Sequence, residues 1–238
     1  MKKLIFILSL LANLMFIIGF GYFIHKKGGV TYLRTKMGLR SEKTFSPKHN
    51  NYWNRKYSLF QVLPNDSTEI IFLGNSITEW CEWSELLENP NIKNRGISGD
   101  NTIGLLDRLD EVVESQPKKI FIEVGINDIK ILNTYEIAHN YESIIQIIKQ
   151  ESPSTNIYLQ SIIPTNFFDT FHPDTIRALN NQIKRIASEN SLIYIDLHDL
   201  FLDEKGNFDM TLSYDGIHPN GKGYLVWKKA VEPFVNEP

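Results

Sequence analysis

Short apolar runs alternate with helical patterns of hydrophobic residues along most of this chain. The apolar runs predict strands at 69–73, 92–94, 119–124, 156–161 and 192–195. Between them, apolar side chains recur at three- and four-residue steps, which predicts helices at 51–63, 102–114, 134–150, 173–189 and 220–235. Short buried strands that alternate with helices are typical of a parallel sheet covered on both faces. We therefore expect one α/β domain over residues 51–238.

The N-terminus has a different pattern. Lys2 and Lys3 precede an uncharged run over 4–24, whose 21 residues suffice to cross the ~30 Å apolar core of a bilayer as a helix. Residues 1–27 therefore indicate either a retained membrane anchor, which we favour because of the length of the run, or a signal peptide cleaved near Gly19-Phe20-Gly21. Residues 28–50 are expected to form a juxtamembrane linker.

Two features of the sequence make opposite predictions about the side of the membrane on which the α/β domain lies. Positive charges after the apolar run outnumber Lys2 and Lys3, which by the positive-inside rule favours a cytoplasmic domain. A single N-terminal apolar helix, in contrast, most often exports the rest of its chain. We expect an extracytoplasmic domain, periplasmic or at the cell surface, with a secreted form if the segment is cleaved.

Composition narrows the class of protein. Apolar residues make up 42% of the chain and charged residues 22%, as in globular proteins. The net charge of −3 and the lack of a basic cluster argue against nucleic acid as a partner. Cys81 is the one cysteine, so the chain can form no intrachain disulfide and no cysteine-based metal site.

Ser76 directly follows the first predicted strand, in the sequence Gly-Asn-Ser. Ligands of open parallel sheets bind beyond the carboxyl ends of the strands, so this serine is a candidate for chemistry. A serine at a strand-to-helix turn can present its hydroxyl, with the following amides aimed at whatever it attacks. The same residue would also suit a helix N-cap, and the two interpretations are compatible.

Two further loops at the same edge contain candidate donors for a developing oxyanion. Gly99 follows the second strand, where a glycine can bring its N–H close to a substrate oxygen. Asn127 follows the third strand and can donate from its side-chain amide. Both segments would also suit ordinary turns.

Asp215 and His218 precede the last predicted helix in the sequence Asp-Gly-Ile-His. The histidine could act as a general base, with the aspartate holding the ring in the useful tautomer. A structural turn is the alternative interpretation. Asp196, His198 and Asp199 form a second candidate group, but His198 should lie on a surface helix just after a strand. We therefore prefer the Asp215 pair, which lies at a loop-to-helix start.

Taken in chain order, these four segments resemble the blocks of the SGNH hydrolase superfamily, the GDSL-like lipases and esterases. The resemblance covers about residues 69–235, and Asn94–Asp100 looks like the second block of the branch of platelet-activating-factor acetylhydrolase-like and lysophospholipase-like enzymes. It implies a three-layer α/β/α sandwich with a five-stranded parallel sheet, as in flavodoxin-like folds. It implies no cofactor and no metal.

The resemblance also implies a role for each residue. Ser76 would be the nucleophile, His218 the general base, and Asp215 the residue that orients it. The backbone amides of Ser76 and Gly99 and the side chain of Asn127 would form the oxyanion hole. The family usually has Gly-Asp-Ser in its first block, whereas this chain has Asn75 in place of the aspartate.

The sequence leaves more than one class of ester substrate open. Aromatic side chains in or near the strand-end loops could line an acyl or sugar-binding face, or could simply pack in the core; they are Trp80, Trp83, Phe167, Phe168 and Phe171. We expect substrate contacts from Asn75, Trp80 and Phe167. A short acyl ester such as an O-acetylated carbohydrate is the expected substrate, with a lysophospholipid or thioester as the alternative. A catalytically inactive binding protein displayed at the membrane is a further possibility.

Overall fold

The computed structural model describes residues 49–167 and 169–237, together with residues 3, 9, 13, 15, 16, 19, 20 and 22. Residues 49–238 form one compact unit. The expected anchor and almost all of the expected linker lie outside the described residues. Among the residues that are described, no helix has both the length and the apolar character needed to cross a bilayer.

Five parallel strands form a single sheet. In chain order they are β1 (Ile70–Gly74), β2 (Ile92–Gly96), β3 (Lys119–Glu123), β4 (Asn156–Gln160) and β5 (Ile193–Ile195). Their order across the sheet is β2-β1-β3-β4-β5. β2 therefore lies on one side of β1, whereas β3, β4 and β5 lie on the other. The strand order reverses between β1 and β3, and ligands of such sheets bind beyond the carboxyl ends of the strands at this point.

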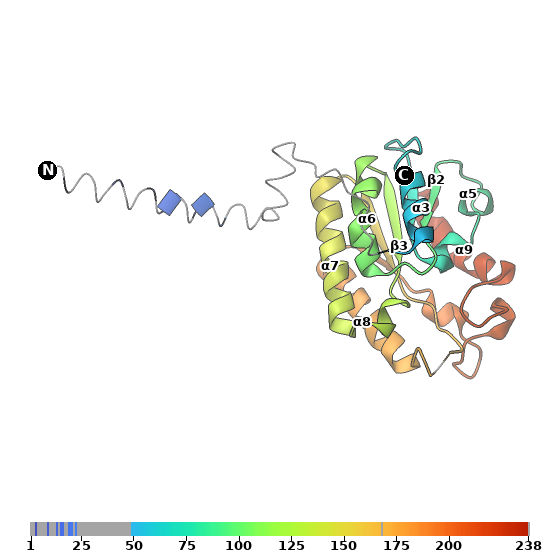
Figure 1. Cartoon of the computed structure of the whole chain (residues 1–238). Coiled ribbons are helices and arrows are strands. Elements are labelled where there is room, and N and C mark those ends of the chain that lie inside the picture. Colours follow the sequence, from blue (N-terminus) through green and yellow to red (C-terminus); the bar gives the residue numbers. More distant parts are fainter. Residues whose placement is uncertain are drawn as a thin grey trace. The chain divides into compact units, whose positions relative to one another are not determined.

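Helices cover both faces of the sheet (Figure 1). The longer helices are α3 (Asn51–Phe60), α6 (Thr102–Glu114), α7 (Thr134–Glu151), α8 (Pro173–Glu189) and α9 (Gly221–Asn236). The shorter ones are α4 (Ser76–Glu79), α5 (Trp83–Leu86), η1 (Asp128–Lys130), η2 (His198–Phe201) and η3 (Met210–Leu212). α6, α7 and α8 pack side by side on one face, and α5 and α9 cover the other. The expected three-layer α/β/α fold with five parallel strands is confirmed.

The face under α9 is built from stacked aromatic rings. Phe72, Phe121 and Tyr158, on β1, β3 and β4, stack with ring centroids 4.8 and 4.4 Å apart. Trp83 lies 4.3 Å from Phe72 and packs edge-on against Trp227 of α9. Trp83 is therefore a core residue and does not line a substrate face, so core packing is the correct one of its two alternatives; Phe171 is buried as well.

The edge strand β2 is longer than its apolar residues predict. Its polar side chains form hydrogen bonds and an ion pair with neighbouring elements. The amide of Asn94 donates to the carbonyls of Thr78, Glu79 and Cys81, where α4 ends. Arg95 forms a buried ion pair with Glu111 of α6, with Nε and Oε1 2.6 Å apart. Buried polar groups are tolerated when they are paired in this way, so the strand continues to Gly96.

Candidate active site

The turn after β1 presents Ser76 at the start of α4. Asn75 caps this helix, and its Oδ1 accepts a hydrogen bond from the backbone N–H of Ile77 at 2.8 Å. The Ser76 Oγ lies 2.9 Å from the Nε2 of His218, although 142 residues separate them in the chain. The fold thus brings together the hydroxyl and the imidazole that the sequence singled out.

The loop before α9 holds the imidazole of His218. Its Nδ1 lies 2.6 Å from the Oδ2 of Asp215, while Asp215 Oδ1 accepts from the backbone N–H groups of Ile217 and His218. Gly216 makes this tight turn possible with a φ of +80°, a conformation that glycine adopts without strain. Burial raises the pKa of the Asp215 carboxyl, but the hydrogen bonds from His218 and Ile217 outweigh it and hold the pKa well below its usual range. The aspartate is therefore ionised and can hold the ring with Nε2 facing Ser76.

Ser213 is a third support of this loop that the sequence pattern did not reveal. Its Oγ lies 3.1 Å from Asp215 Oδ1 and 2.7 Å from the carbonyl oxygen of His218. It also accepts a hydrogen bond from the Gly216 N–H at 2.9 Å. The only signal in the sequence is a serine two residues before an aspartate, which is too common to identify such a role.

Three N–H groups are candidates for holding an oxyanion near Ser76. The amides of Ser76 and Gly99 make no hydrogen bond with any other described residue. Asn127 uses one amide hydrogen to donate to the carbonyl of Asp100 at 2.9 Å, which leaves its second N–H available. This bond joins the loops after β2 and β3, which carry Gly99 and Asn127.

Asp128 links the loop after β3 to the start of α6. It is buried, and it accepts hydrogen bonds from the backbone N–H and the hydroxyl of Thr102 at the first turn of α6. Burial raises the pKa of this carboxyl to about 6, against the lowering effect of the Thr102 bonds. The sequence pattern revealed no role for Asp128, because its partner Thr102 lies 26 residues earlier.

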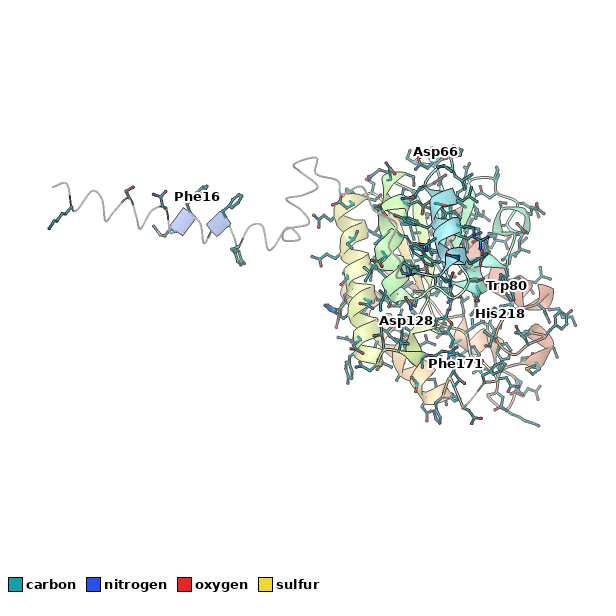
Figure 2. All side chains as sticks on the ribbon, in the orientation of Figure 1. Phe16, Asp66, Trp80, Asp128, Phe171 and His218 are labelled. Carbon is teal, nitrogen blue, oxygen red and sulfur yellow. The ribbon has the colours of Figure 1, made fainter. Side chains whose placement is uncertain are left out.

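The expected substrate-contact residues differ in their placement. The Trp80 side chain is 56% exposed, and its ring stacks on His218 with centroids 3.9 Å apart. Figure 2 shows these two side chains next to each other. Phe167 is also exposed and lies against Gly216, whereas Phe168 is outside the described residues. Asn75 has no exposed surface, so its placement supports a helix cap and does not support a substrate contact.

The second aspartate–histidine group has a different environment. His198 lies in η2 just after β5, and this helix is at the surface as expected, since Asp199 and Leu200 are exposed, but the His198 side chain itself is buried. Its Nδ1 pairs with the neighbouring Asp199 at 3.0 Å. Within residues 49–167 and 169–237, no three histidine, cysteine, aspartate or glutamate side chains are grouped so that they could hold a metal ion.

Known proteins share both the sequence pattern and the fold. The model of the GDSL-like lipase/acylhydrolase family matches residues 72–226, which include Ser76, Gly99, Asn127, Asp215 and His218. The platelet-activating factor acetylhydrolase IB subunit alpha1 of Rattus norvegicus is 28% identical over 180 residues, which cover 70% of this chain and 75% of that protein.

Two solved structures show the same fold. A GDSL-like lipase from Bacteroides thetaiotaomicron has a TM-score of 0.69 and 22% identity, covering 77% of this chain and 96% of its own. A mutant of an acetylxylan esterase from Geobacillus stearothermophilus has a TM-score of 0.59 and 19% identity, covering 74% of this chain and 97% of its own. At these identities the two structures inform the fold alone.

Proposed function

The chain belongs to the GDSL-like lipase/acylhydrolase family, within the SGNH hydrolase superfamily, and is an ester hydrolase; from this premise we propose that Ser76, His218 and Asp215 are its catalytic triad. The observation that carries the proposal is the hydrogen-bonded series from the Ser76 Oγ to His218 at 2.9 Å and from His218 to Asp215 at 2.6 Å. A hydroxyl, an imidazole and a carboxylate in this order are the parts that nucleophilic acyl transfer needs.

In the proposed reaction, the Ser76 Oγ attacks the ester carbonyl carbon while His218 Nε2 takes the hydroxyl proton. The tetrahedral oxyanion accepts hydrogen bonds from the amides of Ser76 and Gly99 and from the Asn127 side chain. Each such donor contributes about 3 kcal/mol to stabilising the transition state. His218 then gives its proton to the leaving alcohol, and an acyl-enzyme remains. Water, activated by the same imidazole, attacks this ester and releases the acid.

The Trp80 ring stabilises the positively charged form of His218 that arises during this reaction. Its ring lies against the imidazole with an interplanar angle of 26°, and the face of an indole attracts a neighbouring cation. His218 carries a positive charge only between the two proton transfers of each step. The indole therefore stabilises the imidazolium most when the tetrahedral intermediate is present.

We propose a short acyl ester, such as an acetyl group on a carbohydrate, as the substrate. The related platelet-activating factor acetylhydrolases are named for removing an acetyl group, and the acetylxylan esterase shares the fold. The exposed faces of Trp80 and Phe167 beside the triad would suit a sugar ring. A lipid ester such as a lysophospholipid is the second candidate, because the same aromatic surface would also suit an alkyl chain.

The proposal is tested by the Ser76→Ala variant. We expect it to lose labelling by a fluorophosphonate probe and to lose hydrolysis of p-nitrophenyl acetate, while its thermal unfolding stays close to that of the wild type. Ser84→Ala is the control, since this serine starts no strand-end turn and should leave both signals intact. Hydrolysis by Ser76→Ala at the wild-type rate would remove the serine from its role. Acetyl, butyryl and palmitoyl esters, compared by kcat/KM, would separate the two substrate classes.

The place of the enzyme in the cell stays a prediction from the N-terminal sequence. We propose that residues 1–27 anchor the chain in a membrane and that the hydrolase domain is extracytoplasmic. Protease accessibility of an epitope at the C-terminus, in intact compared with lysed cells, would test it. An epitope protected in intact cells would contradict the proposed side.

A further inference from the structure

Helix α3 lies outside the residues matched by the family model, yet its side chains reach the loops of the candidate site. The Trp53 Nε1 donates to Asp100 Oδ1 at 2.9 Å, in a buried hydrogen bond. The Tyr52 hydroxyl and the Lys56 Nζ both donate to Glu79 Oε1, at 2.5 and 2.9 Å. α3 therefore contacts the last residue of the nucleophile helix α4 and the loop after β2.

The carboxylate of Glu79 connects these elements. Its Oε2 accepts from the backbone N–H of Ser98 at 2.7 Å and from the Ser98 hydroxyl, so that four donors surround the two oxygens. The Glu79 side chain is only 8% exposed. Burial raises its pKa, but the bonds from Ser98, Tyr52 and Lys56 together outweigh burial and lower the pKa below its ordinary value. The group is thus ionised, and its hydrogen bonds are of the strong, charge-assisted kind.

Gly99 lies between the two residues that are held in this way. Ser98 is bonded to Glu79, and Asp100 is bonded to Trp53 and to Arg108, whose Nε lies 2.8 Å from Asp100 Oδ2. Gly99 itself has a φ of +80°, and no atom lies within 4 Å of where its Cβ would be. Since Gly99 is exposed and has no side chain to pack, we infer that the direction of its N–H depends on the anchors at either side.

The same network reaches the general base. The Trp80 Nε1 donates to Ser98 Oγ at 3.1 Å, and the Ser98 hydroxyl donates in turn to Glu79. The Trp80 ring stacks on His218. A single carboxylate is thereby linked through Ser98 to the loop that carries one candidate oxyanion donor and to the ring that packs against the imidazole.

We propose that Glu79, fixed by Tyr52 and Lys56 of helix α3, is a positioning residue for catalysis: it holds the Gly99 amide toward the oxyanion and, through Ser98, the Trp80 ring against His218. This inference rests on the proposed function. It makes α3 part of the catalytic apparatus, although no residue of α3 touches the reacting atoms. Removing one oxyanion donor lowers kcat by about 10²–10³. Loosening the loop that carries a donor should cost less, about tenfold.

The experiment compares two double variants of the full chain. Tyr52→Phe/Lys56→Met removes both α3 donors to Glu79 and keeps their apolar portions. The control, Arg55→Met/Tyr57→Phe, also replaces one basic residue and one tyrosine of α3. These two side chains donate to groups other than Glu79: Arg55 donates to the Asn51 carbonyl and Tyr57 donates to Asp110. Active sites are counted by stoichiometric fluorophosphonate labelling, and kcat is expressed per labelled site. We expect about a tenfold lower kcat in the first variant, with KM within about threefold, and a kcat within about twofold of the wild type in the second.

Glu79→Gln, with the exposed Glu82→Gln as its control, is the second test. The amide retains one acceptor oxygen and turns an N–H toward two donors, so we expect at least a tenfold loss of kcat per labelled site. A purely structural role would lower the melting temperature or the number of labelled sites and leave kcat per site unchanged; that result in both tests would overturn the inference. A rise of KM at constant kcat would overturn it too. A wild type that neither hydrolyses esters nor is labelled at Ser76 would instead overturn the proposed function, and this inference with it.

Discussion

The carboxyl group of Glu123 lies in the core and predicts a specific pH dependence of the free energy of unfolding. Glu123 ends β3, four residues before Asn127, and pairs with Gly74 of β1. The residue has no exposed surface, and neither carboxyl oxygen has a hydrogen-bond partner among the described residues. Burial raises its pKa from 4.5 to about 8. The folded protein therefore holds this group neutral at neutral pH.

The sign of the pH dependence follows from the two pKa values. Below pH 4.5 the carboxyl is protonated in both the folded and the unfolded chain, so it has no effect on the pH dependence. Between pH 4.5 and about 8 only the unfolded chain ionises, and the free energy of unfolding falls by about 1.4 kcal/mol per pH unit. Above pH 8 both states are ionised and the slope vanishes. The stability lost over the window is about 5 kcal/mol at most.

The perturbation is Glu123→Gln, which keeps the shape of the side chain and removes the titration. We expect the variant to match the wild type within about 1 kcal/mol at pH 5 and to be more stable by about 4 kcal/mol at pH 8. Urea unfolding followed by circular dichroism at pH 5, 6, 7, 8 and 9 measures both proteins. Because the other carboxyl groups titrate in both, the difference between the two curves isolates residue 123.

The matched control is Glu204→Gln, which removes a carboxyl group from an exposed loop. Its stability should follow the wild-type curve at every pH. Parallel curves for Glu123→Gln and the wild type would refute the reasoning, because they would mean that the buried carboxyl group titrates alike in the folded and unfolded chain.

Three further predictions concern the site and its scaffold. Asn127→Ala should lower kcat about a hundredfold with little change in KM, because its bond to the oxyanion forms in the transition state; a change in KM alone would make it a ground-state contact. Asp215→Asn should lower kcat by about 10⁴, since an amide favours the wrong imidazole tautomer, and steady-state kinetics within tenfold of the wild type would contradict this. Lys119→Met should lower the free energy of unfolding by about 1–3 kcal/mol, because the Lys119 ammonium donates to the carbonyls of Phe234 and Glu237 at the end of α9; denaturant titration measures it, and an unchanged midpoint would show that water replaces the bonds.

The elements themselves were largely predictable from local patterns. The predicted helix over 102–114 matches α6, and that over 173–189 matches α8, which begins at Pro173 after the cap His172. The strand ends fall within one residue of their predictions except at β2, which extends two residues further. There the sequence Ile-Lys-Asn-Arg-Gly lacks a continuous apolar run, and only pairing with β1 and the bonds of Asn94 extend the strand.

The candidate site was predictable as a set of positions, because parallel strands bring their carboxyl ends to one edge. That argument places Ser76, Gly99, Asn127 and His218 together without saying how their side chains are held. It predicted neither the burial of Asn75 nor that of His198. It also did not identify Glu79, whose partners Tyr52 and Ser98 lie 27 and 19 residues away.

The sequence by itself determined where the longer helices and four of the five strands lie, and which polar residues follow the strands. Periodicity, caps and turns depend on interactions within about four residues, so a local pattern suffices to specify them. The tertiary structure alone decided which polar groups meet: the hydroxyl of Ser76 with the imidazole of His218, and the carboxylate of Glu79 with donors from helix α3 and from the loop after β2. Such contacts depend on the order of strands in the sheet and on the packing of helices across it, which bring together residues that no local pattern relates.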